Sequence, residues 1–133
     1  MNYTKIQTLL DNHLKTYSGL PTLQLENTQE QYKTGKSFVR ATLITSRPTR
    51  ATVGVTGRDR LVGLYQIDVF TTLNAGVTQK NALVDGLVAH FPRTLVLADG
   101  DVTLNMEMSW AETGGREQQF YSARVMIEWA CIM

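Results

Sequence analysis

The sequence predicts an α+β fold in which a mostly antiparallel sheet of about six to seven strands carries two helices packed on one face. Two segments of helical length have apolar residues at three- and four-residue spacing, and short runs rich in β-branched and aromatic residues lie between them. Turn residues divide the last third of the chain into three more strand-like runs. At 133 residues, the chain has the length of one domain, expected to span residues 1–133.

The first predicted helix covers residues 3–17, where apolar side chains recur on one stripe. Residues 18–21 include a glycine and a proline and are expected to end it. The second helix is expected to be capped by Thr78 and to end before Pro92. The apolar stripe predicted for it consists of Ala82, Leu83, Leu87, Val88 and Phe91.

Before the second helix, alternating or β-branched runs predict strands at residues 22–26, 38–45, 49–55 and 64–71. The last of these is the clearest, because Tyr65, Ile67 and Val69 share one face. The glycine-bearing stretch 54–63 favours a flexible connection or a bulged hairpin tip over a regular strand.

After the second helix, three strands are predicted at residues 95–98, 102–110 and 118–132, joined by turns at Asp99-Gly100 and at residues 112–117. Strict alternation in the middle strand places Glu107 on the face opposite Met106 and Met108.

The last predicted strand is apolar on both faces, since Val125, Ile127 and Trp129 alternate with Met126 and Ala130. Two helices on one face of the sheet can cover only one of these two sets. The other set packs either against loops of the same chain or against a neighbouring subunit.

The formal net charge of +1 argues against a dedicated nucleic-acid binder, but the charge is unevenly distributed. Residues 1–98 hold eleven basic and six acidic side chains, whereas residues 99–133 hold two basic and six acidic ones. Residues 47–60 are rich in arginine, which favours a solvated basic hairpin or a protein-docking surface over direct contact with DNA. The candidate interface residues are Arg47, Arg50, Arg58 and Arg60 on the basic side, with Glu112, Glu117 and Glu128 on the acidic side.

No residue pattern predicts catalysis, a metal site or a cofactor. His13 lies on the apolar stripe of the first helix and is expected to pack its ring and bond locally, while His90 is placed to complement the end of its own helix. The single cysteine, Cys131, excludes an intramolecular disulfide and is expected to be buried.

Membrane insertion and export are not predicted either. No run approaches the roughly 20 apolar residues that span a bilayer. The first residues are too polar for a signal peptide. We therefore expect a cytosolic protein with no membrane partner.

Residues 38–97 contain, in order, an arginine-bearing strand, a glycine-rich basic hairpin, the run Gly63–Phe70, a glycine turn and a helix that ends in Phe91-Pro92-Arg93. This series of elements gives the chain a resemblance to the tail terminator-like family of long-tailed bacteriophages. A final hairpin carrying Trp110 and Trp129 extends it, together with the first helix and Leu20-Pro21, over nearly the whole chain. The length of this hairpin, which runs from Val102 to Ile132, departs from the family pattern.

This resemblance implies a structural protein, not an enzyme, that forms a homo-oligomeric ring, a hexamer when mature, on the last ring of a tail tube. The ring would stop polymerisation and offer a surface to the head. Implied partners are the tail tube protein and the head-tail connector protein, with DNA passing through the ring without sequence-specific binding. The implied location is the virion tail, after assembly in the host cytoplasm. The alternatives are a head-completion or stopper protein of the same gene cluster and a small cytosolic α+β enzyme with an interface pocket.

Overall fold

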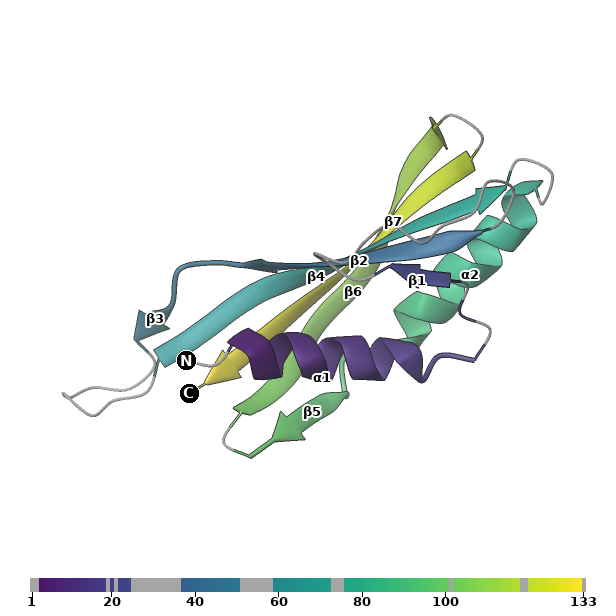
Figure 1. Ribbon diagram of the computed structural model, residues 1–133. Helices are drawn as coiled ribbons and strands as arrows, with labels where there is room; N and C mark the ends of the chain where they lie inside the picture. The colour runs from purple at the N-terminus through teal and green to yellow at the C-terminus, as the bar shows by residue number, and fades with distance from the viewer. Residues whose placement is uncertain are drawn as a thin grey trace.

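The computed structural model describes residues 3–18, 20, 22–24, 37–50, 59–72, 76–100, 102–117 and 120–132. Figure 1 shows how the helices and strands of these residues follow one another. In chain order they are α1 (Tyr3–Lys15), β1 (Thr22–Gln24), β2 (Phe38–Thr45), β3 (Thr49–Arg50), β4 (Asp59–Thr72), α2 (Gly76–His90), β5 (Val96–Asp99), β6 (Val102–Glu117) and β7 (Phe120–Ile132).

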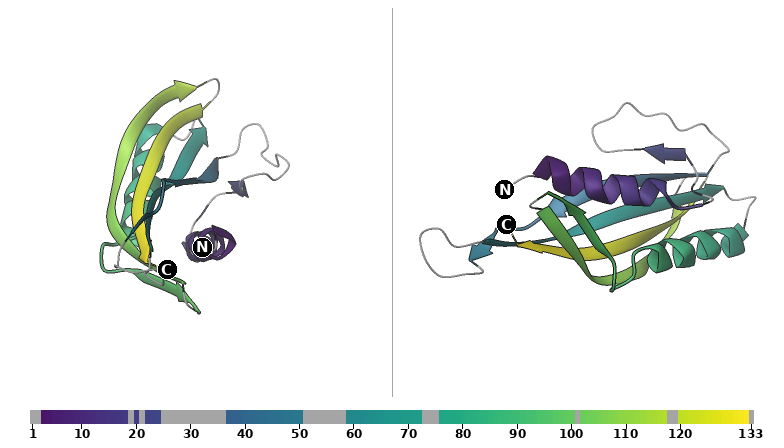
Figure 2. Two further views of the ribbon diagram at one scale, coloured as in Figure 1. Left: turned by 90° about the vertical axis from the view of Figure 1, so that its left-hand side faces the viewer. Right: turned by 90° about the horizontal axis from the view of Figure 1, so that it is seen from below.

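The strands join into one sheet in the order β1-β2-β4-β7-β6-β5, and Figure 2 shows that this sheet is curled. Within the described part of the chain, five strands (β2, β4, β7, β6 and β5) make up its antiparallel body. β1 adds three residues in parallel to β2, and β3 adds two residues beside the start of β4. The α+β class is confirmed, but the expected six to seven strands are corrected to five, because two short alternating runs contribute only minor edge pairing.

β4 and β7 form the centre of the sheet and pair along residues 60–72 and 120–132. β4 begins at Asp59, so the prediction of a flexible connection was wrong for residues 59–63. Pairing with strands on both sides holds this segment extended despite its glycine, since strand formation depends on context more than on intrinsic preference. The rest of the predicted connection and of the strand predicted at 49–55, residues 51–58, lies outside the described residues.

β6 is longer than the sequence predicted. It continues through residues 112–117, where a turn was expected, and the chain reverses between Glu117 and Phe120 instead. A register shift against β7 within this segment accommodates its two glycines in the strand. The expected turn between β5 and β6 is present, and Gly100 adopts there a positive φ of 64° that favours glycine.

An irregularity at Glu107 changes which side chains of β6 share a face. The pairing with β7 shifts between Met106 and Met108, so that Met106 lies opposite Trp129 and Met108 lies opposite Glu128. Met106 is consequently buried, whereas Met108 is 50% exposed. The expectation that both methionines share a face was wrong, because a bulge adds one residue to the alternation.

The concave face of the sheet, called here the inner face, carries the hydrophobic core, with α1 lying along it (Figure 2). Tyr65, Ile67 and Val69 of β4 are fully buried there, which confirms the predicted face of this strand. Cys131 is also fully buried, as expected. β7 contributes Ala123, Val125, Ile127, Trp129 and Cys131 to the same cluster.

α1 buries Ile6, Leu10 and Leu14 completely in this core, following the predicted stripe. The hydroxyl of Tyr65 donates a hydrogen bond to Oδ1 of Asp11, which joins the helix to the centre of the sheet. The helix ends at Lys15, two residues before the predicted end.

α2 packs Val84 and Leu87 into the core, and Phe91, directly after the helix, joins them there. The predicted stripe missed Val84 and wrongly included Ala82, which is exposed. Thr78 is not the cap, because the helix already begins at Gly76. These errors concern where the helix starts and how it is rotated, which tertiary packing decides.

Trp129 is among the largest fully buried side chains and lies against Gly63 of the neighbouring strand. A Cβ atom at position 63 would lie 2.6 Å from Cζ2 of the indole and would also collide with the backbone carbonyl oxygen of Ile44. The absence of a side chain at Gly63 therefore makes room for the tryptophan.

Candidate functional site

The convex face of the sheet, called here the outer face, is the candidate interaction surface. The core residues of both helices pack against the inner face. On the outer face, Met126 and Ala130 of β7 are 7% and 5% exposed, so the last strand is buried on both faces. Ile44 and Met108 on the same face are 40% and 50% exposed. Exposed apolar side chains beside a buried apolar strand are typical of a surface that a partner covers.

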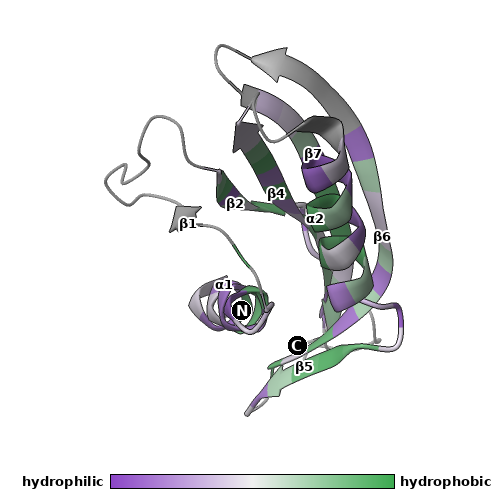
Figure 3. Ribbon diagram, turned by 90° about the vertical axis from the view of Figure 1, so that its right-hand side faces the viewer, coloured by the Kyte–Doolittle hydropathy of each residue, from purple (hydrophilic) through white to green (hydrophobic). Residues whose placement is uncertain are grey.

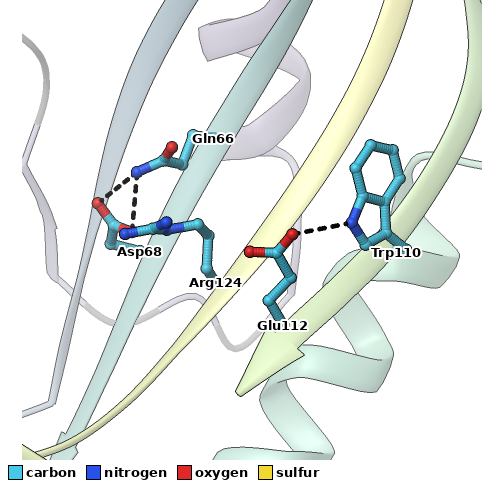
Figure 4. A network of polar contacts seen from close by, with 5 residues as sticks. All are labelled: Gln66, Asp68, Trp110, Glu112 and Arg124. Atoms are coloured by element: carbon cyan, nitrogen blue, oxygen red, sulfur yellow. Dashed lines mark hydrogen bonds and ion pairs between the residues drawn. The ribbon is translucent and has the colours of Figure 1, made fainter. Parts of the chain in front are cut away.

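Four charged side chains of alternating sign cross the outer face from strand to strand. Arg40 of β2 is paired in register with Asp68 of β4, which is paired with Arg124 of β7, and Glu112 of β6 follows. Arg124 Nε lies 3.2 Å from Asp68 Oδ1, and Gln66 donates to the same carboxylate at 3.1 and 3.2 Å (Figure 4). Opposite charges on directly paired strands stabilise one register over its alternatives.

Aromatic side chains engage both ends of this row. The indole Nε1 of Trp110 donates to Glu112 Oε1 at 3.3 Å (Figure 4). At the other end, the guanidinium carbon of Arg40 lies 5.4 Å from the centre of the Phe70 ring. The charges of the row therefore already have partners within the chain. The main effect of the row is to stabilise the pairing of the strands that it crosses.

Next to the row, the outer face is hollowed to a volume of about 470 Å³. This outer hollow is lined mainly by apolar side chains, with one basic and one acidic side chain among them. Arg60 lines the hollow and pairs with Glu107 at 3.4 Å, whereas Glu128 has no ion pair or hydrogen bond within the described part of the chain. The residues that define the hollow are Ile44, Arg60, Val62, Leu64, Trp110 and Glu128.

The structure brings only part of the predicted interface residues together. Arg60 and Glu128 line the same hollow, and Arg47 is exposed on the connection that leaves β2. Glu112 lies in the charged row instead. The backbone of Arg50 in β3 pairs with that of Asp59 in β4, and the backbone of Glu117 lies at the end of β6. Arg58 lies outside the described residues.

Sequence reasoning missed Asp68, Arg124 and Trp110 as parts of this face. Alternation with Tyr65 puts Asp68 on the opposite face, but its charged neighbour is 56 residues away in the chain. Alternation along single strands gives the face of a residue, and only the register between strands gives its partner.

The two histidines join the C-terminal ends of α1 and α2. His13 Nε2 donates to the carbonyl oxygen of His90 at 2.7 Å, and His90 Nε2 donates to that of His13 at 2.8 Å. Their rings stack with centroids 4.2 Å apart, and the edge of Phe91 packs beside them. His13 was expected to bond locally and His90 to complement the end of its own helix. Both expectations were wrong about the partner, because each ring bonds to the opposite helix.

Burial lowers the pKa of His13, because the charged imidazolium loses hydration. The hydrogen bond to the His90 carbonyl opposes this shift, and the nearby charge of His90 adds to it. The shift favours the neutral form of His13, and the two hydrogen bonds between the rings and the opposite carbonyl groups clasp the two helices together, which suits a structural role.

A second, smaller hollow of about 240 Å³ lies where α1, α2 and the end of β4 meet. Tyr17, Ser37 and Gln79 line it together with Thr71, whose buried hydroxyl has no hydrogen-bond partner in the described part of the chain. A hollow of this polarity can hold ordered water.

Among the described residues, no cluster of His, Cys, Asp and Glu side chains could hold a metal ion. No helix of the described chain is long and apolar enough to cross a membrane.

Comparison with known proteins bears on the role of these surfaces. One solved structure is 17% identical in sequence and covers 98% of this chain and 96% of its own, with a TM-score of 0.74. At this identity the likeness shows a shared fold alone. None of the curated proteins is significantly similar in sequence. A family model described as phage tail terminator protein matches residues 5–129, which confirms the resemblance inferred from the sequence. The chain therefore belongs to the phage tail terminator protein family.

Proposed function

We propose that the protein assembles into a hexameric ring that caps the phage tail tube, ends polymerisation of the tube and provides the surface that joins tail to head. Membership of the family, over residues 5–129, is the observation that carries this proposal. The partners are further copies of the chain, the tail tube protein and the head-tail connector protein. Assembly takes place in the host cytoplasm, and DNA passes through the ring without sequence-specific contact.

A ring of identical subunits needs two different surfaces on each subunit that fit one another. The exposed apolar side chains of the outer face support one such surface. A second candidate lies at β5, which is hydrophobic along much of its length in Figure 3. This strand pairs with β6 on one side, and its Val96 is 54% exposed. We propose that the arginines of residues 47–60 meet acidic residues of a neighbouring subunit or of the tube.

Deletion of the gene tests the capping role. A cap that occupies the end of a polymer limits its growth, so lysates of the deletion mutant should contain tails of abnormal length or tails without heads. Electron microscopy measures both quantities, and supplying the intact gene from a plasmid is the control. Tails of uniform length joined to heads would refute the proposal. Normal tails beside heads that lose their DNA would indicate a head-completion protein instead.

The ring itself is tested on the purified protein and on purified tails. Mass measurement over a range of concentrations should show self-association, and electron microscopy of tail ends should show a terminal ring. A protein that is strictly monomeric in solution and also on tails contradicts the ring.

A further inference from the structure

The outer hollow combines apolar walls with a single acid that has no partner among the residues that the structure describes. Glu128 is exposed and lies in register between Leu64 of β4 and Met108 of β6. Ile44 and Trp110 complete the apolar surroundings. Once an occupant covers the hollow, the apolar walls keep water away from this carboxylate, which strengthens its attraction for a cation.

Two basic side chains near the hollow are engaged elsewhere. Arg60 pairs with Glu107 at 3.4 Å, and Arg124 pairs with Asp68 at 3.2 Å. Within the described residues, no cation pairs with Glu128. An occupant that matches the hollow therefore carries a basic group beside an apolar stem, a description that fits arginine.

The chain carries a matching group at the rim of the same hollow. Arg47 is exposed and makes no ion pair or hydrogen bond within the described residues. It follows Ser46, which lines the hollow and is fixed to the carbonyl oxygen of Val62 by its backbone nitrogen at 3.2 Å and its hydroxyl at 2.8 Å. Ile44, 40% exposed, lies three residues before Arg47. Each copy of the chain thus carries two groups that could pair with each other between copies. One is the acid in the hollow, and the other is the arginine near an exposed apolar residue.

We propose that the outer hollow binds a second copy of this chain, which places its Arg47 against Glu128. Arg47 and the hollow lie on the same surface of each copy, so two copies related by a two-fold axis can each give one arginine and receive one. The aliphatic stem of Arg47 packs on the apolar walls while its guanidinium meets the carboxylate. The proposal rests on the self-assembly proposed above and names the surface that mediates it.

Charge reversal of the full-length protein tests the pairing. Arg47→Glu and Glu128→Arg each replace the attraction with a repulsion and should weaken self-association by about tenfold or more. The double variant Arg47→Glu/Glu128→Arg restores opposite charges and should return to within about threefold of the wild type, as coupled sites do. The neutral variants Arg47→Gln and Glu128→Gln should give smaller losses. Analytical ultracentrifugation over a range of concentrations measures the association, and circular dichroism verifies that each variant folds.

The matched control reverses one base and one acid away from the hollow. Lys15 of α1 and Asp85 of α2 are both exposed, and Lys15→Glu/Asp85→Arg leaves the net charge unchanged. This variant should associate like the wild type. A similar loss in the control would mean that charge reversal acts on the whole protein and not on the hollow, and it would overturn the proposal.

The same variants, supplied to the deletion phage, separate this inference from the capping role. If both single variants lower the yield of headed tails and the double variant restores it, a second copy occupies the hollow, even where association of the free protein is too weak to measure. If the singles fail and the double also fails, the arginine contacts a different protein and the inference is wrong. Singles that associate and cap normally also overturn it. In both cases the capping role stands, because it depends on the deletion phenotype alone.

Discussion

A methyl group at position 63 should destabilise the protein more than its size suggests. Gly63→Ala would place a Cβ atom 2.6 Å from Cζ2 of Trp129 and against the carbonyl oxygen of Ile44. Trp129 is fully buried and the carbonyl belongs to the backbone of β2, so neither neighbour is the free end of a flexible side chain. The strand or the indole must shift to make room.

The size of the effect follows from two opposing contributions. Overpacking of a filled core costs roughly 1 to 3 kcal/mol, and two rigid neighbours place this site in the upper half of that range. Alanine also restricts the unfolded chain more than glycine does, which returns about 0.4 to 1 kcal/mol. The net loss in the free energy of unfolding should be about 2 kcal/mol, which for a chain of this size lowers the urea midpoint by about 1 M.

Urea unfolding followed by circular dichroism measures this loss. The double variant Gly63→Ala/Trp129→Leu identifies its cause, because a smaller side chain at position 129 leaves space for the methyl group. Its loss should be smaller than the sum of the two single losses, with a coupling of about 1 kcal/mol or more. A Gly63→Ala protein as stable as the wild type would refute the reasoning from close packing.

Three further results are expected from urea unfolding. Because burial lowers the pKa of His13, the unfolded chain binds a proton that the folded chain does not, so stability should fall as pH drops below about 6.5, and His13→Gln should flatten this dependence. A wild-type stability that is constant from pH 7.5 to 5 contradicts the lowered pKa of His13. Tyr65→Phe should lose about 1 to 2 kcal/mol with its bond to Asp11, and much less in an Asp11→Ala background. Arg124→Gln should lose at most about 1 kcal/mol, since its side chain is 49% exposed, and a larger loss would show that the charged row acts as a unit.

Sequence patterns were informative about single elements. The strand at Phe38–Thr45 has the predicted bounds, because its dense β-branched and aromatic residues coincide with burial on the sheet. The buried face of residues 65–69 and the stripe of α1 also followed from periodicity. These features depend on the direction of side chains along one segment, which alternation or helical spacing determines.

The errors lie where a second segment decides the outcome. Residues 59–63 and 112–117 contain glycines that favour turns, yet both are held in strands by pairing with β7. The bulge at Glu107 has no signal in the alternation of β6. For the candidate site, Arg60 and Glu128 could be named from composition, but that they line one hollow depends on the register of β4 and β7.

The pairing of β4 with β7 has a consequence for how the chain acquires its fold during synthesis. The two central strands are separated by α2, β5 and β6, so the middle of the sheet closes only after the segment Phe120–Ile132 has left the ribosome. Until then, the edge of β4 that pairs with β7 in the finished sheet has no partner strand. Contacts between distant segments form slowly, and such exposed edges favour aggregation. A nascent chain that stalls before β7 is therefore expected to need a chaperone or a protease rather than to persist as a folded fragment.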